Sequence, residues 1–209
     1  MYDDRHINCL LENFMMDRPD KKTLTRARII DTATKAILRN GYHGIGVVDI
    51  MKGAGLTHGG FYAHFASRTD LLVEVAATAS AKSLAQLNKV ADSASPEQGL
   101  QAIIDSYLSD RHLNAPQHGC PIAALGGEMP RQAPEVRATA TRGIEQFAQF
   151  LSSTMPAGHQ ADAFGLMSCL IGALVLARAV DDPVLSATIR ASAEHFIRTA
   201  LHSETTSND

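Results

Sequence analysis

Hydrophobic side chains recur with a helical period from residue 25 onward, and the first such stretch predicts a helix over residues 25–40. Thr25 is a candidate N-cap, and Arg39 and Asn40 before Gly41 supply a basic last turn and a glycine stop. The apolar positions form a single stripe along this helix, which would face a core. They are Ile29, Ile30, Ala33, Ala36 and Ile37.

Two much shorter helical segments follow, separated by a turn. Residues 47–53 and residues 58–65 are predicted to be helical, and the turn between them contains Gly55. Ser67 then caps a long predicted helix that runs to about residue 91. Two short helices around a glycine-containing turn are typical of a helix-turn-helix.

The remainder of the chain is predicted to be helical, with prolines at the starts of several helices. Proline is favoured at the first helical position because its missing N–H would have no partner there. The expected helices cover residues 95–115, 119–129, 134–155, 160–180 and 183–202. The sequence shows no internal repeat and no strand-like alternation, so the expected fold class is all-α.

The composition agrees with a folded helical chain. Of 209 residues, 45% are hydrophobic, which excludes a disordered protein. Aromatic residues make up only 5% and Trp is absent, which favours helix over strand. The 3 cysteines leave one unpaired in any disulfide scheme, so we expect a reduced, cytoplasmic protein.

No targeting or membrane segment is expected. Residues 1–20 are acidic and lack the apolar stretch of a signal peptide. Residues 1–22 are interpreted as an extension, for which Met15 or Met16 offers an alternative start. The most apolar run, residues 163–180, contains Ser168 and Arg178 and is interpreted as a buried helix rather than a membrane span.

The net charge of −3 is unevenly distributed along the chain. Residues 21–75 carry +4, whereas residues 1–20 carry −3 and residues 76–209 carry −4. A basic segment attached to an acidic body indicates contact with a polyanion. The alternative is a chance cluster of charges on a solvated surface.

The predicted helix-turn-helix has two distinct faces. Leu56, Phe61 and Phe65 would pack the second short helix onto the first. Gly59 and Gly60 each cost roughly 1 kcal/mol of helix propensity relative to Ala, which is reasonable if the backbone must approach a DNA groove closely. The face opposite the apolar residues carries Thr57, His58, Gly59, Tyr62 and His64.

These segments together resemble the DNA-binding domain of the TetR family of transcriptional repressors. The resemblance covers about residues 25–71 and rests on Gly41-Tyr42, Val47-Val48-Asp49-Ile50, the run AGLTHGGFYAHF at 54–65, Ser67-Arg68 and Leu71-Leu72. It implies a helix-turn-helix DNA-binding domain over residues 23–72 and a ligand-binding and dimerisation domain over residues 73–209. It also implies a homodimer on a palindromic operator that a small-molecule effector, an electrophile or oxidant among the candidates, would release.

The resemblance assigns roles to individual residues. Base edges would be contacted by Thr57, His58 and Gly59, and phosphates by Tyr62, His64, Lys52, Arg68 and Arg28. Three of these roles have an alternative: Tyr62 is a surface-packed core residue, His64 satisfies a backbone carbonyl, and Lys52 is a solvated helix end. The chain departs from the family at Gly46, because the family usually has a hydroxyl residue before the second helix.

The C-terminal half is expected to dimerise and to bind the effector. Residues 163–180 are apolar nearly all round, so this helix must be buried on more than one side, either in a dimer or in a monomer core. The expected dimer interface contains Gly165, Cys169, Gly172, Leu176, Ile189 and Phe196. The candidate ligand-binding residues are Tyr107, His112, Cys120, Met129, Phe147 and Met167, and they leave the chemistry of the ligand open.

Cys120 is the one candidate for a reactive side chain. Pro121 marks it as an N-cap, where the helix N–H groups favour a thiolate. Some TetR-family members that respond to electrophiles carry a cysteine in the corresponding region, so the resemblance allows a sensor role. The alternative is a small residue packed at a helix start.

No metal or cofactor site is expected, because the 9 histidines lack ligand spacing. The chain has no G-x-S-x-G, P-loop, H-E-x-x-H or C-x-x-C motif, so we do not expect an enzyme. Two alternatives to a DNA-binding regulator remain: an enzyme, and a helical interaction module without DNA binding.

Overall fold

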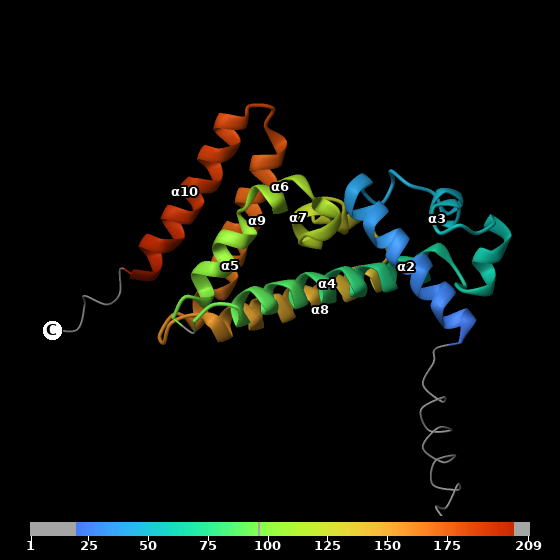
Figure 1. The fold of residues 1–209 in the computed structure, drawn as a ribbon, viewed down its shortest axis with the longest axis horizontal. Helices are drawn as coiled ribbons and strands as arrows, with labels where there is room; N and C mark the ends of the chain where they lie inside the picture. Colours follow the sequence, from blue (N-terminus) through green and yellow to red (C-terminus); the bar gives the residue numbers. More distant parts are fainter. Residues whose placement is uncertain (1–19, 96, 203–209) are drawn as a thin grey trace, which may run out of the picture.

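The computed structural model describes residues 20–95 and 97–202, and within these ranges the chain forms helices and no strand. The all-α prediction is therefore confirmed. The molecule is elongated, with the two short helices at one end and the last two helices at the other (Figure 1). Most of the predicted extension, residues 1–19, lies outside the described residues, together with Cys9, Met15 and Met16.

Helix α2 spans Lys21–Asn40 and begins four residues earlier than predicted. Asp20 caps it, because its carboxylate accepts the backbone N–H of Thr23 at 2.6 Å. The same hydrogen bond holds the pKa of Asp20 below its usual value. Thr25, the expected cap, lies inside the helix instead. The helix ends as predicted at Gly41, whose φ of 81° lies in the left-handed region that favours glycine.

The two short helices differ in type. Helix α3 spans Val47–Gly53 as predicted, and the turn after it contains Gly55 with a φ of 69°. The second predicted helix is present as η1, a 3₁₀-helix over His58–Ala63 that ends two residues earlier than expected. Gly59 and Gly60 account for this difference, since glycine is a poor helix former and short, irregular helical segments commonly take the 3₁₀ form.

Helix α4 spans Arg68–Asp92 and connects the two halves of the molecule. Ser67 caps it as predicted, with its hydroxyl accepting the Asp70 N–H at 3.0 Å. Leu71 near its start and Leu87 near its end belong to different hydrophobic cores. Because α4 is continuous, the domain boundary predicted between residues 72 and 73 falls inside a helix.

Residues 97–202 contain six α-helices and three 3₁₀ turns. They are α5 (Gly99–Tyr107), α6 (Asp110–Asn114), η2 (Pro116–His118), α7 (Pro121–Leu125), η3 (Met129–Arg131), α8 (Pro134–Thr154), η4 (Gln160–Asp162), α9 (Ala163–Ala179) and α10 (Pro183–His202). Helices α4 and α8 run side by side through the middle of the molecule (Figure 1).

Three of the predicted C-terminal helices are divided in the structure. The segment 95–115 breaks at Leu108, because Ser109 accepts the His112 N–H at 3.2 Å and so begins α6. The segment 119–129 contains only the five residues of α7 before a turn. Residues 160–162 form a 3₁₀ turn before α9. Helices α8 and α10 match their predicted bounds to within one residue.

The first hydrophobic core holds the helix-turn-helix together and also receives residues from the C-terminal half. Leu125 of α7 and Val136 of α8 are buried in it. Helices α7 and α8 are therefore packed directly against the N-terminal helices. The fully buried side chains of this core include Ile29, Ile37, Ile50, Phe61, Phe65 and Leu71.

Helix α9 is buried on one side only. The buried residues are Ala163, Leu166, Met167, Leu170, Ala173, Leu174 and Ala177. Among the described residues, Gln160–Ala179 is the one helix long and apolar enough to cross a membrane by length and composition. Its buried side packs against α7, α8 and α10, whereas Phe164, Val175 and Leu176 on the other side are exposed.

Candidate nucleic-acid interface

Two buried phenylalanines fix the orientation of η1. Phe61 and Phe65 are both fully buried, and their rings stack with centroids 5.5 Å apart. Leu56 packs beside them and is half-buried, so all three side chains face inward as predicted. Because these residues occupy the inner side of η1, its other side is turned to solvent.

The outer side of η1 carries the residues that the sequence assigned to DNA. Thr57, His58 and Gly59 are exposed. Tyr62 is 69% exposed, which excludes the alternative that it is a core residue. Its ring meets the edges of His58 and Phe61, at centroid distances of 6.5 and 5.3 Å. These contacts hold the phenol beside the first turn of η1 and leave its hydroxyl accessible.

Gly59 has open space where a side chain would project. A Cβ built there meets no atom within 4 Å, and its φ is not in the left-handed region. Neither packing nor backbone geometry within this chain therefore requires glycine at this position. A requirement for glycine would have to come from a molecule that approaches η1 from outside.

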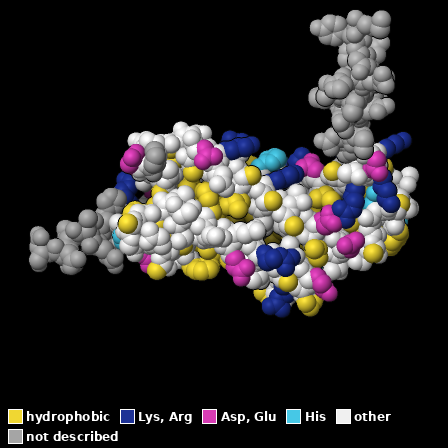
Figure 2. Space-filling view, turned by 90° about the horizontal axis from the view of Figure 1, so that it is seen from below, with side chains coloured by type: hydrophobic (Ala, Val, Ile, Leu, Met, Phe, Trp, Pro, Cys, Tyr) yellow, Lys and Arg dark blue, Asp and Glu magenta, His cyan; other side chains and the backbone are white. Residues whose placement is uncertain are grey.

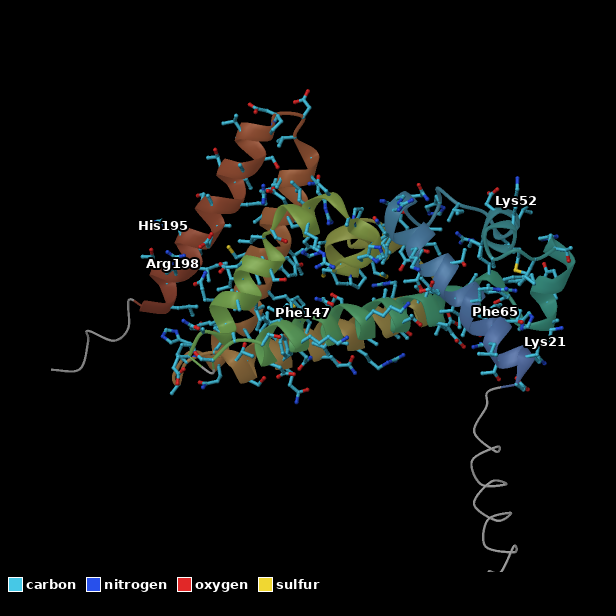
Figure 3. The ribbon with its side chains drawn as sticks, viewed as in Figure 1. Lys21, Lys52, Phe65, Phe147, His195 and Arg198 are labelled. Carbon is cyan, nitrogen blue, oxygen red and sulfur yellow. The ribbon has the colours of Figure 1, made fainter. Side chains whose placement is uncertain are left out.

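The predicted phosphate contacts differ in their surroundings. Lys52 and Arg28 are exposed, and Figure 3 shows Lys52 at the outer end of α3, pointing away from the body of the protein. Charged side chains of both signs cover this end of the molecule (Figure 2). Arg68 does not fit a free phosphate ligand, because its guanidinium donates to the Tyr42 carbonyl oxygen and so ties α4 to the loop before α3.

His64 lies at the edge of the predicted surface. The residue is half-buried, and its Nδ1 is buried with no hydrogen-bond partner in the part of the chain that the structure describes. Its backbone carbonyl accepts the Arg26 Nε–H at 3.3 Å. That Nδ1 therefore does not satisfy a backbone carbonyl, which was the alternative to a phosphate contact.

Arg26 has a positioning role that sequence reasoning missed. Its guanidinium pairs with Glu74 of α4 and lies over the Phe65 ring, 4.7 Å from the centroid. Glu74 raises the pKa of Arg26 through this hydrogen bond. Arg26 thus joins α2, α4 and the end of η1. Its partners lie 38 and 48 residues away in the sequence, so no local pattern could have revealed them.

Glu128 connects the C-terminal half to the same region. Its carboxylate accepts the Tyr42 N–H at 3.0 Å, just after α2 ends. A side chain on Gly41 would collide with this carboxylate. Burial, with a smaller contribution from Glu128, raises the pKa of Tyr42 to about 12. Gly41 is therefore required both for its backbone conformation and for the close approach of Glu128.

A pocket of about 470 Å³ lies between α2, α4 and the α5–α7 segment. Three predicted ligand residues, Tyr107, His112 and Cys120, line it. The other three do not. Met129 packs against the first core. Met167 is buried in the second core, which includes Leu87, Ile103 and Leu170. Phe147 faces a separate cavity of about 20 Å³, and it projects between α8 and α5 in Figure 3. Long apolar side chains here fill a core rather than surround a ligand.

His112 organises the wall of this pocket. Its Nδ1 is 2.7 Å from the Tyr107 carbonyl oxygen, and its Nε2 accepts the Cys120 N–H at 2.9 Å. The two bonds together require a neutral ring with the proton on Nδ1. Burial lowers the pKa of His112 to about 4.

Cys120 occupies the N-cap position of α7 as predicted, and its burial favours the alternative of a small packed residue over a reactive thiolate. The residue is buried, and this burial raises the pKa of its thiol. The penalty for burying a charged thiolate outweighs the stabilisation that the backbone N–H groups of the five-residue helix α7 would give it. Burial therefore favours the protonated thiol over the thiolate.

The burial of His112 predicts an acid-sensitive fold. The pKa of His112 is lower in the folded chain, about 4, than its usual value of 6.5. Its contribution to stability is therefore complete above pH 6.5 and is lost as the pH falls toward 4. By linkage the full loss is about 3 kcal/mol. Denaturant titrations across this window should show it. A His112→Gln variant should be less stable at pH 7.5 and should lose less on acidification, and an unchanged slope would contradict this account.

The exposed face of α9 and α10 contains most of the expected dimer-interface residues. Leu176 is 57% exposed and Phe196 is 65% exposed. Side chains added at Gly165 or Gly172 would meet no atom within 4 Å, so both glycines leave open, flat positions on the surface of α9. Cys169 and Ile189 are only half-buried against the second core, at the junction of α9 and α10.

The fold and the exposed face of η1 define a helix-turn-helix DNA-binding protein. Residues 29–75 match the model of bacterial regulatory proteins of the tetR family, and residues 96–193 match the model of a tetracyclin repressor-like C-terminal domain. The chain belongs to the TetR family of transcriptional regulators. Because proteins of this family are regulators and not enzymes, the enzyme alternative is rejected.

Solved structures of TetR-family regulators share this fold. A regulator from Cytophaga hutchinsonii is 20% identical, with a TM-score of 0.74 over 87% of this chain and 97% of that one. A regulator from Agrobacterium tumefaciens is 21% identical, with a TM-score of 0.70 over 84% and 98%. The reduced form of E. coli NemR is 19% identical, with a TM-score of 0.69 over 84% and 95%. No match was found among curated protein sequences.

Proposed function

We propose that this regulator is a cytoplasmic repressor that binds a palindromic operator as a homodimer and leaves it when a small molecule binds. The outer face of η1 carries the proposal. Phe61 and Phe65 hold the helix from inside, so Thr57, His58 and Tyr62 are exposed on its outer side. Side chains presented in this way from a short helix suit a major groove.

The proposed contacts divide into two kinds. Thr57 and His58, at the start of η1, contact base edges and determine sequence preference, while Gly59 lets the backbone come close to the DNA. Tyr62, Lys52 and Arg28 contact phosphates, which position the protein without reading sequence. Arg68 acts instead by holding the Tyr42 loop in place, and His64 lies at the margin of the surface.

The proposed homodimer rests on the exposed apolar face of α9 and α10. Phe164 and Leu176 of α9 and Phe196 of α10 are all more than half exposed. Large side chains of this kind, gathered on two adjacent helices, mark an interaction surface. A second copy of the same face would cover them and form a four-helix interface with two-fold symmetry. Two-fold symmetry in turn requires a palindromic operator.

A gel shift with DNA flanking the chain's own gene tests the proposed DNA binding. We expect a complex that resists competitor DNA and weakens as salt increases. A transcriptional reporter carrying the same DNA distinguishes repression from activation. Loss of reporter signal on expression of the regulator supports a repressor, and a gain would contradict one.

Gly59→Ala is expected to separate DNA binding from folding. The added methyl group meets nothing within the subunit, so thermal stability should be unchanged or slightly higher. On the operator the same methyl group would stand between the backbone and the groove, and we expect binding to weaken by at least about tenfold, or 1.4 kcal/mol. Gly127→Ala, at another open glycine away from this face, is the matched control. Equal operator affinity of the two variants would contradict the close approach.

The proposed effector is a reversible ligand of the pocket rather than a thiol-modifying reagent. Because the Cys120 thiol is buried and protonated, N-ethylmaleimide should leave the operator complex intact over times that modify an accessible thiol. The Cys120→Ser variant should behave in the same way. Rapid release that disappears in Cys120→Ser would show that the thiol becomes exposed and would restore the sensor role.

A further inference from the structure

The charged side chains that line the pocket are all cationic. Its lining includes Lys35 of α2, Lys82 and Lys89 of α4, and Arg111 of α6, but no Asp or Glu side chain. Leu38, Leu87 and Tyr107 supply a buried apolar floor among these cations. A concave site with an apolar floor and a rim of like charges selects its ligand by shape and by charge.

Two of the four cations share a single carboxylate, which offsets one of their two charges. Asp31 accepts Lys35 at 2.7 Å and Lys82 at 2.6 Å, and the two lysines hold its pKa below the usual value. No carboxylate within residues 20–95 and 97–202 lies at ion-pair distance from Lys89 or Arg111. The pocket therefore presents a positive potential that the protein itself leaves uncompensated.

We propose that this pocket binds a small organic anion, whose carboxylate or phosphate group pairs with Lys89 and Arg111 while its apolar body lies over Leu38, Leu87 and Tyr107. A neutral ligand would leave the cations uncompensated, and a cation would be repelled by them. The volume of about 470 Å³ lies in the range of small-molecule sites. The inference deepens the proposed function, because it names the chemical class of the effector.

The position of the pocket explains how such an anion would affect DNA binding. Its walls come from α2 of the DNA-binding domain, from α4, and from the α5–α7 segment. An anion held by Lys89 and Arg111 also attracts Lys82, which lines the same pocket and whose ion pair with Asp31 joins α4 to α2. The ligand thereby changes the packing of α2, and with it the position of η1, without first moving the dimer interface.

A fluorescent anion tests the proposal on the full-length protein without DNA. The probe is 8-anilinonaphthalene-1-sulfonate, and the competitors are benzoate, phenyl phosphate, benzyl alcohol and benzylamine. We expect the two anions to displace the probe and the alcohol and the amine not to. The stronger of benzoate and phenyl phosphate tells whether the natural ligand carries a carboxylate or a phosphate.

Paired variants locate the binding. Lys89→Gln with Arg111→Gln should raise the Kd of the probe about tenfold, because it removes both uncompensated partners. Lys22→Gln with Arg137→Gln removes two exposed charges elsewhere and should leave the Kd unchanged. Equal affinities of the two double variants, or displacement by benzylamine as effective as by benzoate, would overturn the proposal. A gel shift without any anion tests DNA binding separately, so failure of the pocket and failure of the proposed function give different results.

Discussion

Tyr62→Ala is expected to weaken operator binding by about two powers of ten while leaving the fold intact. The side chain is 69% exposed and is not part of the hydrophobic core, so its removal costs little stability. A hydrogen bond to a charged phosphate contributes about 1.5 kcal/mol or more, and two half-sites double the loss to about 3 kcal/mol. Fluorescence anisotropy titrations in moderate salt measure the change.

The pattern across DNA sequences distinguishes a phosphate contact from base reading. Tyr62→Ala should weaken binding to operator and to unrelated DNA alike, because phosphate contacts carry no sequence information. Substitutions of Thr57 or His58 should alter the preferred sequence instead. Tyr62→Phe separates the hydroxyl from the ring and should lose nearly as much as Tyr62→Ala. Wild-type affinity of Tyr62→Ala would show that the docking geometry is wrong.

Gly172→Arg is expected to split the homodimer without unfolding the subunit. A side chain at this position points into open space in the subunit, so the arginine can be accommodated there. In a dimer across α9 and α10, the same guanidinium would be buried without a partner, and two copies would meet near the two-fold axis. An uncompensated buried charge costs about 3–5 kcal/mol, which raises the dimer Kd by at least about a hundredfold.

Light scattering and analytical ultracentrifugation at micromolar concentration measure this effect. Wild type should be a dimer and Gly172→Arg a monomer with the helical circular dichroism of wild type. Ala157→Arg, which adds the same charge in an exposed loop, is the control and should remain dimeric. A wild-type monomer, or a Gly172→Arg variant that stays dimeric, would contradict the assignment of this face.

Local patterns predicted the helix-turn-helix well because its signals lie close together in the sequence. The Gly41 stop and the Ser67 cap make hydrogen bonds within four residues, and the spacing of Phe61 and Phe65 marks both as inward-facing. The error at the start of α2 also has a local cause, because two nearby residues could each cap the helix. Asp20 caps the helix in place of Thr25 because its carboxylate accepts the Thr23 N–H. This capping hydrogen bond, rather than the first apolar residue, sets where the helix begins.

Interactions between distant segments could not be predicted from one sequence. The Glu128–Tyr42 hydrogen bond joins residues 86 positions apart, and the Asp31–Lys82 ion pair joins residues 51 apart. For the same reason, only three of the six predicted ligand-binding residues line the pocket. Tyr107, His112 and Cys120 are close in sequence, whereas the α2 wall that includes Lys35 belongs to a segment assigned wholly to DNA binding. Met129 and Met167 are apolar, and the sequence alone does not tell whether such side chains contact a ligand or fill a core.

DNase I footprinting on the DNA flanking the chain's own gene reports the binding, the position and the symmetry of the operator complex in one measurement. We expect a single protected palindrome whose two half-sites are separated by about one helical turn, 34–36 Å, or more. Tyr62→Ala and Gly172→Arg should each remove the footprint at protein concentrations that protect fully with wild type. Protection without two-fold symmetry, or a footprint retained by Tyr62→Ala, would contradict the claim that the outer face of η1 binds an operator as part of a homodimer.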